Sequence, residues 1–579
     1  ASANVGIGRL ALTANTTGAS NVAIGCCALK SNTTASNNVA VGFESLKSNT
    51  EGTNNVAVGK DALNDNTTAS ANTAIGTGTL SKTITGANNT AVGFASLLVN
   101  TASNNTTVGA YSLCDNTTGA SNTGLGYSSL DSNTEGDNNV AVGADALNKN
   151  TTADNNTAVG MSALKLNTTG CQNVAVGATS LDANTTGCMN TAIGRSALGA
   201  NISGLCNTAL GRTAMELNTT GCYNVAVGKD SLASNTTANY NVAVGRNTLF
   251  KNTTGELNTS IGDSAGKCNT TGDKNTAIGY SSLYNNTTAD NNTAVGYASM
   301  LANTTGANNT AVGLCVLESN TSGCYNHALG RNTLMENTSG CYSTAIGQQA
   351  LTASVATGDT GNTAVGGSAM LSNTTGTNNT ALGRCALVCN TTAVNNTAVG
   401  KDALKLSTTA TQNTAIGMLS LDAATSGSYN SGLGYASLSV LTTGAFNVGA
   451  GYIAGNGITT GSYNVAIGSH SLATTTTASN NTAVGSCALN KNTSGVDNVA
   501  MGTCALDSNT TGSSNVAIGY SALTTNTSAA NNTAVGHLAL RYNTTGTSNV
   551  AVGTTSLDAN TTGNNITAVG YNALTANTT

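Results

Sequence analysis

Apolar and small residues recur along this chain at a fixed spacing of 17 residues. The clearest marker is the pentad N-[VT]-A-[VI]-G, and successive copies of it end on Gly25, Gly42 and Gly59. Within one copy, Val56 and Val58 lie two residues apart, on the same face of a strand, with the small Ala57 between them. A short period that continues along a whole chain is the signature of a solenoid, in which each repeat is one coil.

We number each repeat from its glycine, so that position 1 of the repeat 59–75 is Gly59. About 34 such repeats fill residues 1–579, and we expect a single continuous array. The spacing changes twice, by one missing residue in 93–109 and by two added residues in 347–366. The chain begins and ends inside a repeat, which favours a window of a longer protein whose anchoring parts lie elsewhere.

The residue types at each position predict which side chains face the core. Position 5 is nearly always Leu, as at Leu63, and positions 15 and 17 carry the β-branched pair Val56 and Val58. Position 9 is usually Thr and otherwise another β-branched residue. We expect these four positions to form the core. Positions 4 and 16 are held small, as at Ala57, which predicts close approach of another backbone. The glycine at position 1 fits a corner that needs positive φ or tight packing.

The alternation in V-A-V and in N-T-T, punctuated by Gly and Asn, predicts strands rather than helices, for example at 56–58 and 66–68. About two short strands and two turns account for one coil. Stacked coils would pair as parallel β-structure, with like residues above like at roughly 4.8 Å. The predicted fold is therefore an all-β parallel β-solenoid, stabilised by neighbouring coils and by lateral association.

Composition excludes several classes of function. Charged residues make up 8% of the chain and aromatic residues 3%, with no Pro or Trp, unlike an ordinary globular enzyme. The net charge of -5 provides no basic surface for nucleic acid and no polybasic membrane signal. No apolar run approaches the ~20 residues of a transmembrane helix, so we expect no membrane partner within this segment.

The pentads 21–25 (Asn-Val-Ala-Ile-Gly) and 464–468 (Asn-Val-Ala-Ile-Gly) resemble the head repeats of trimeric autotransporter adhesins. Similar V-A-[VI]-G repeats occur in phage and algal-virus tail-fibre proteins. The resemblance implies a left-handed parallel β-roll, three associated chains, and a location on a cell or virion surface. The adhesin heads repeat at a shorter spacing, so the A-L-x-x-N-T-T segment lengthens each coil here, and a longer coil could also close as a fuller β-helix.

The Asn at position 8 begins an N-x-[ST] sequon in most repeats. Candidate glycosylation sites are Asn15, Asn32, Asn66, Asn116, Asn167, Asn184 and Asn218. Position 10 accepts Glu51 and Glu135, so it faces solvent, and by alternation we expect position 8 to face solvent too. The alternative to glycans is a stacked ladder of Asn side chains that share hydrogen bonds. A flat array of Asn and Thr also resembles the surface of ice-binding solenoids, although those usually carry Thr-x-Thr.

Cysteines recur at equal positions of adjacent coils. The pairs are Cys171 with Cys188 and Cys324 with Cys341 at position 12, and Cys487 with Cys504 at position 3. One step of the stack falls within the Cα spacing of about 4.4–6.8 Å that a disulfide tolerates. Disulfides between coils would suit an oxidising, extracellular setting, and free thiols are the alternative. No His accompanies these cysteines at zinc-ligand spacing, so we expect no metal site.

No group of residues predicts catalysis, and we expect neither an enzyme nor a cofactor. The three histidines, His327, His470 and His537, have no recurring acid or nucleophile partner. Scattered Tyr at position 2, as at Tyr127 and Tyr520, would make a lateral or ligand-contact stripe. The sequence predicts the shaft of an extracellular structural fibre that associates with copies of itself. The alternative is an adhesin or viral tail fibre that recognises a host-surface glycan or receptor, and ice binding is the least favoured.

Overall fold

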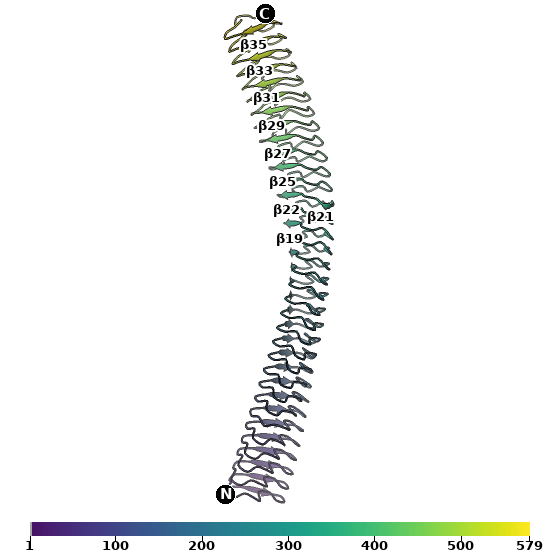
Figure 1. The fold of residues 1–579 in the computed structure, drawn as a ribbon, viewed down its shortest axis with the longest axis vertical. Helices are drawn as coiled ribbons and strands as arrows, with labels where there is room; N and C mark the ends of the chain where they lie inside the picture. Colours follow the sequence, from purple (N-terminus) through teal and green to yellow (C-terminus); the bar gives the residue numbers. More distant parts are fainter. Residues whose placement is uncertain (1–2) are drawn as a thin grey trace. The chain divides into compact units, whose positions relative to one another are not determined.

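The structure, a computed structural model, describes residues 3–579 as strands of three residues joined by turns, with no helix in that range. The chain divides into two units, Ala1–Asp290 and Asn291–Thr579. Each unit is a parallel β-solenoid with one coil per repeat (Figure 1). The predicted fold class is therefore confirmed within each unit. The handedness of the coil and the continuity of the array from one unit to the next stay predictions.

Every strand of the first unit occupies positions 15–17 of its repeat. These strands are β1 Val5–Ile7, β2 Val22–Ile24, β3 Val39–Val41, β4 Val56–Val58, β5 Thr73–Ile75, β6 Thr90–Val92, β7 Thr106–Val108, β8 Thr123–Leu125, β9 Val140–Val142, β10 Thr157–Val159, β11 Val174–Val176, β12 Thr191–Ile193, β13 Thr208–Leu210, β14 Val225–Val227, β15 Val242–Val244, β16 Thr259–Ile261 and β17 Thr276–Ile278. Successive strands pair in parallel and in register, so that Ala57 of β4 lies beside Ala74 of β5. Like residues therefore form columns, each column being one repeat position in successive coils.

The second unit follows the same plan. Its strands are β18 Thr293–Val295, β19 Thr310–Val312, β20 His327–Leu329, β21 Ser339–Cys341, β22 Thr344–Ile346, β23 Thr357–Asp359, β24 Thr363–Val365, β25 Thr380–Leu382, β26 Thr397–Val399, β27 Thr414–Ile416, β28 Ser431–Leu433, β29 Val448–Ala450, β30 Val465–Ile467, β31 Thr482–Val484, β32 Val499–Met501, β33 Val516–Ile518, β34 Thr533–Val535, β35 Val550–Val552 and β36 Thr567–Val569. Strands β21 and β23 pair only with each other and lie outside positions 15–17. Among the described residues no helix has the length and hydropathy that a membrane span requires.

The strand faces are the reverse of the prediction. Ala57 has no exposed surface, whereas Val56 and Val58 are only partly buried. The assignment of positions 15 and 17 to the core is therefore wrong. The reason is the narrow interior: a Cβ added at Gly432, which replaces Ala at position 16, would lie 2.5 Å from Oγ of Ser420 on the opposite wall of the coil. The predicted close approach at Ala57 is confirmed, and its partner is the same chain.

Position 5 supplies the large apolar side chains of the core, as predicted. Leu63 has no exposed surface, and its backbone φ of +48° lies in the left-handed region. Asp61 at position 3 has a φ of +58°. Two left-handed residues so close together turn the chain back beneath the strand, and the Leu63 N–H donates to Thr79 O in the next coil at 3.0 Å. The segment 66–68 is part of this turn system, so the prediction of a second strand there is wrong.

The glycine column has the predicted role. Gly59 has a φ of +137°, which side chains rarely allow, and an added Cβ would lie 2.6 Å from the carbonyl carbon of Gly76 in the next coil. Both constraints require glycine. Gly25 and Gly42 have φ values of +134° and +137° for the same reason.

The loop that holds the two added residues of 347–366 supplies a side chain that takes the place of a missing Asn. Ser343 stands at position 14, where nearly all other coils have Asn, and its shorter side chain leaves space. Thr360, from the lengthened loop, fills that space with its Oγ1 at 2.6 Å from Ser343 Oγ, and it donates to Cys341 O at 2.7 Å. The insertion and the substitution therefore compensate each other.

Candidate functional site

A ladder of asparagine side chains runs through the interior at position 8. In Asn167, Nδ2 donates to Asn150 Oδ1 in the preceding coil at 2.8 Å and to Gly170 O at 2.8 Å. The side chain has no exposed surface. The predicted ladder is confirmed, but the expectation that position 8 faces solvent is wrong. Alternation fails here because the residues form a turn rather than a strand.

The same geometry overturns N-glycosylation at six candidate sites. Both hydrogens of each side-chain nitrogen are donated, and none of these side chains has exposed surface: Asn32, Asn66, Asn116, Asn167, Asn184 and Asn218. A glycan would remove a donated hydrogen and would need space that the interior lacks. Asn15, in the first described coils, is half-buried and donates to Gly18 O at 3.1 Å, so modification there stays a prediction.

A second buried ladder at position 14 was not predicted. The Asn55 backbone N–H donates to Asn38 Oδ1 at 2.9 Å, and Asn55 Nδ2 donates to Ala69 O at 2.9 Å. The side chain thus joins the strand to the opposite turn while satisfying the backbone of the coil that follows. The signal in the sequence was the Asn that precedes nearly every V-A-V-G.

The position 8 ladder is interrupted where Asn is replaced. Thr83 and Ser407 cannot reach the preceding coil, and the Oδ1 atoms of Asn66 and Asn390 have no hydrogen-bond partner. A buried acceptor without a partner costs stability. We therefore expect T83N to stabilise its coil by about 1 kcal/mol. Local hydrogen exchange of the amides around Asn66 would measure this gain.

The control for T83N is I84N, at the neighbouring outward position, where Ile84 is 48% exposed. This variant adds the same side chain outside the coil and should leave exchange around Asn66 unchanged. Equal protection in T83N and the wild type would contradict the ladder account.

Five successive coils of the second unit lack the Asn of position 8. Ser407, Ala424, Leu441, Ile458 and Thr475 stand there instead. Leu441 and Ile458 have no exposed surface, so position 8 is apolar in these two coils, whereas the position 14 ladder continues through Asn430, Asn447 and Asn464.

The cysteine pairs at position 12 lie side by side in adjacent coils. The Sγ atoms are 3.1 Å apart in Cys171 and Cys188 and 2.8 Å apart in Cys324 and Cys341. These four cysteines are free thiols in the structure, and so are Cys487 and Cys504. Burial, together with the hydrogen bond to Cys341, raises the pKa of the Cys324 thiol to about 11.

Disulfide formation at these pairs stays a prediction with a defined pH dependence. The thiolate is the reactive form, so a raised pKa makes oxidation slow at neutral pH and faster as pH rises toward 9. We expect glutathione disulfide to link Cys324 to Cys341 in the folded chain, and peptide mapping without reduction detects the bond. A rate independent of pH, or linkage of Cys324 to a distant cysteine, would contradict this arrangement.

Position 9 faces outward, against the prediction that it belongs to the core. Ile84, Ile202 and Val355 are 43–48% exposed there. The usual Thr donates its hydroxyl to the next coil, as from Thr168 Oγ1 to Thr185 O at 2.9 Å. Position 10 is exposed, as predicted from the two glutamates. Because the Asn of position 8 is buried, the flat Asn-and-Thr surface that suggested ice binding does not exist.

The outer strand face, made of positions 15 and 17, contains no Asp, Glu, Lys or Arg. Position 17 holds only Val, Ile, Leu, Met or Ala, and position 15 holds Val or Thr with few exceptions. Ile75 at position 17 is 41% exposed, Ile24 37% and Leu125 45%. A continuous exposed apolar face marks a site of interaction.

Aromatic side chains gather at particular coils rather than along one stripe. At position 13, Tyr223 stacks on Tyr240 with ring centroids 5.2 Å apart, and Tyr325 stacks on Tyr342 at 5.0 Å. At position 2, Tyr127 and Tyr520 are more than half exposed. The densest group, in the second unit, is described below.

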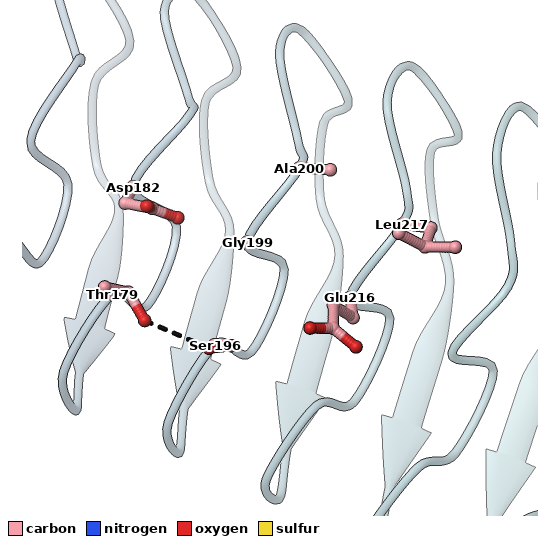
Figure 2. A pocket seen from close by; sticks show the side chains of 7 residues that line it. All are labelled: Thr179, Asp182, Ser196, Gly199, Ala200, Glu216 and Leu217. Carbon is pink, nitrogen blue, oxygen red and sulfur yellow. Dashed lines mark hydrogen bonds between the residues drawn. The ribbon is translucent and has the colours of Figure 1, made fainter.

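A small hollow in the first unit lies where Gly199 separates two acidic side chains. Figure 2 shows Asp182, Gly199 and Glu216 at the same place in three successive coils. The hollow has a volume of about 340 Å³. Burial raises the pKa of Asp182. No group of three or more His, Cys, Asp or Glu among the described residues is placed to hold a metal ion. Two carboxylates in a shallow hollow identify no ligand.

The three histidines lie in different coils. His470 Nδ1 is 2.9 Å from Ser469 Oγ, and its ring lies beside Tyr452. His537 stacks on Tyr520, and His327 begins β20. Comparison with models of known protein families gives no match to the chain, and neither does a search of curated proteins. The structure therefore establishes a β-solenoid repeat scaffold, and its role has to be argued from its surfaces.

Proposed function

We propose that the chain is the shaft of an extracellular structural fibre, which associates side by side with copies of itself. The observation that carries this proposal is the outer strand face. Its position 17 column is apolar in every repeat and remains partly exposed in a single chain, by 41% at Ile75 and 38% at Ile193 and to a smaller extent at most of the valines. Covering such a column removes apolar surface from water at each coil, and this is favourable.

The spacing of the coils supports a second copy as the partner. The outer face repeats at about 4.8 Å, so only a surface with the same period can match it over many coils. Another copy of this chain has the same period, because it consists of the same 17-residue repeats. A stable interface buries about 800 Å² per partner, which requires a surface that continues over many coils, as this column does within each unit. The cysteine pairs fit an oxidising location outside the cell.

Lysine substitutions at three successive strands provide the test. In V142K/V159K/V176K the charges lie on the outer strand face, whereas T152K/T169K/T186K places the same stack of charges at exposed position 10. We expect sedimentation velocity to show assembly of the wild type and of the position 10 control, and loss of assembly in the strand-face variant. A wild type that stays monomeric, or a strand-face variant that assembles equally well, would refute the proposal.

A further inference from the structure

One stretch of the second unit has no charged side chain at all. Residues 423–490, between Asp422 and Lys491, contain no Asp, Glu, Lys or Arg. Acidic and basic residues occur 45 times in the chain, the sum of 25 and 20, and are otherwise distributed along it. The outer surface of these coils therefore carries no ionic group that could select a charged ligand.

Two rows of aromatic rings lie on these coils, one before and one after strands β28, β29 and β30. The first row is Tyr429, Phe446 and Tyr463, with successive centroids 4.8 and 5.0 Å apart and rings within 6° of parallel. The second row is Tyr435, Tyr452 and His470, with centroids 5.4 and 5.5 Å apart. We call these six residues the aromatic strip.

The rings of the strip are open to solvent at their outer edges. The five Tyr and Phe side chains are 43–59% exposed. In the first row each ring covers its neighbour, and in the second row Tyr435 stacks on Tyr452 while the His470 ring is tilted by 58°. The outward surface therefore consists mainly of ring edges, hydroxyl groups and the faces at the row ends. Between the rows lie exposed strand residues such as Leu433 and Val448. The exposed ring edges are apolar and the tyrosine hydroxyls are polar, so they suit a ligand that presents both apolar groups and hydroxyls.

The interior changes in the same coils. Leu441 and Ile458 replace the asparagines of position 8, and glycines appear where most other coils have larger residues. A Cβ at Gly449 would lie 2.7 Å from Leu438 Cγ, and one at Gly455 would lie 2.7 Å from Leu438 Cδ2. These coils thus depart from the rest in charge, in outer surface and in packing together, which marks a specialised segment of the solenoid.

We propose that the aromatic strip binds an extended neutral polysaccharide that runs along the stack of coils. The ring spacing of 4.8–5.5 Å is close to the length of one pyranose unit in an extended chain, so one sugar would lie on each coil. Sugars present apolar C–H groups, which can contact the ring edges, and hydroxyls, which can form hydrogen bonds with the tyrosine hydroxyls. Rigid aromatic side chains give up little conformational entropy when they bind.

The strip is confined to three coils, whereas the outer strand face continues through the coils of each unit. At β28, β29 and β30 that face lies between the two rows, so a second copy and a sugar would compete for these coils. Sugar binding goes beyond the self-association proposed above, because it depends on the aromatic rings rather than on the position 17 column. Lateral assembly through the strip is an outcome that the test must separate.

Isothermal titration calorimetry of the full chain with cellohexaose, with polygalacturonic acid as an acidic comparison, tests the proposal. We expect binding of cellohexaose and none of the acid. Y435S/Y452S should weaken binding at least tenfold, and Y452F, which removes one hydroxyl, should weaken it less. The control is Y223S/Y240S, which removes a stacked pair of tyrosines at position 13 in the first unit, where Lys229 and Asp230 lie nearby in the sequence.

Three results would overturn the proposal. The first is absence of cellohexaose binding by the wild type, and the second is an equal loss in Y223S/Y240S. The third is a loss of self-association in Y435S/Y452S without sugar binding by the wild type, which would assign the strip to a second copy. Hydrogen exchange of 423–490 in each variant confirms that the coils remain folded, so that a loss of binding reports on the strip.

Discussion

Replacing Gly366 with alanine is expected to unfold its coil, whereas replacing the adjacent Gly367 should change almost nothing. Gly366 has a φ of +135°, and an added Cβ would lie 2.6 Å from the carbonyl of Gly383 in the next coil. Gly367 has nothing within 4 Å of an added Cβ. Backbone strain and the clash together should cost at least about 3 kcal/mol in G366A, against about 0.5 kcal/mol or less in G367A.

Urea unfolding, followed by hydrogen exchange of 347–383, would measure the difference between the two glycine variants. In a solenoid each coil depends on its neighbours, so loss of protection should spread to the adjacent coils in G366A. Equal stability of the two variants would mean that Gly366 does not lie against the backbone of Gly383 in the next coil. The pair is closely matched, since the same methyl group is added at neighbouring residues.

An acidic residue introduced on the inner face of a strand is expected to lower the free energy of unfolding strongly. Ala158 has no exposed surface, and a carboxylate there would be buried without a partner, at a cost of several kcal/mol. Val159, its neighbour in β10, is partly exposed on the outer face. We expect A158D to abolish the cooperative unfolding transition of its coils and V159D to change the free energy of unfolding by about 0.5 kcal/mol. Circular dichroism during urea titration distinguishes the two.

The opposite ranking, with V159D the more damaging, would restore the original prediction that the valines form the core. Sedimentation velocity at low concentration controls for assembly, because V159D also places a charge on the face proposed to associate. A stability difference seen in the monomer therefore reports on the coil alone.

Much of the fold could be predicted from the sequence because it depends on the period. The spacing of 17 residues indicates parallel stacking of like residues, and the glycine column and Leu63 were assigned correctly. The choice between the two strand faces could not be made, because alternation in V-A-V defines two faces without saying which is inside. That choice depends on the width of the coil, which is set by left-handed residues such as Asp61 and Leu63. Leucine is rarely left-handed, so no propensity rule predicts this turn.

The candidate surfaces were predicted less completely for the same reason. By alternation, Asn66 was expected to face solvent, but the turn around it places its side chain in the interior. The Asn of this sequon therefore forms part of the buried ladder and is not a glycan site. The second ladder, through Asn55, depends on contacts across the coil, so the recurring Asn before V-A-V-G marked the position without showing what it binds. The aromatic strip was missed because its rings lie at three different repeat positions and meet only when the coils stack.

Oxidation of the native methionines by hydrogen peroxide tests the arrangement of the coils most directly. Met215, Met300 and Met370 occupy position 5 and have no exposed surface, whereas Met501 occupies position 17 and is 42% exposed. Met161 is 59% exposed and provides the fast reference. With the protein monomeric, peptide mass spectrometry should show Met501 oxidised at nearly the rate of Met161 and the position 5 methionines protected. Protection of Met501, or oxidation of Met215, Met300 and Met370 at the rate of Met161, would contradict the structure.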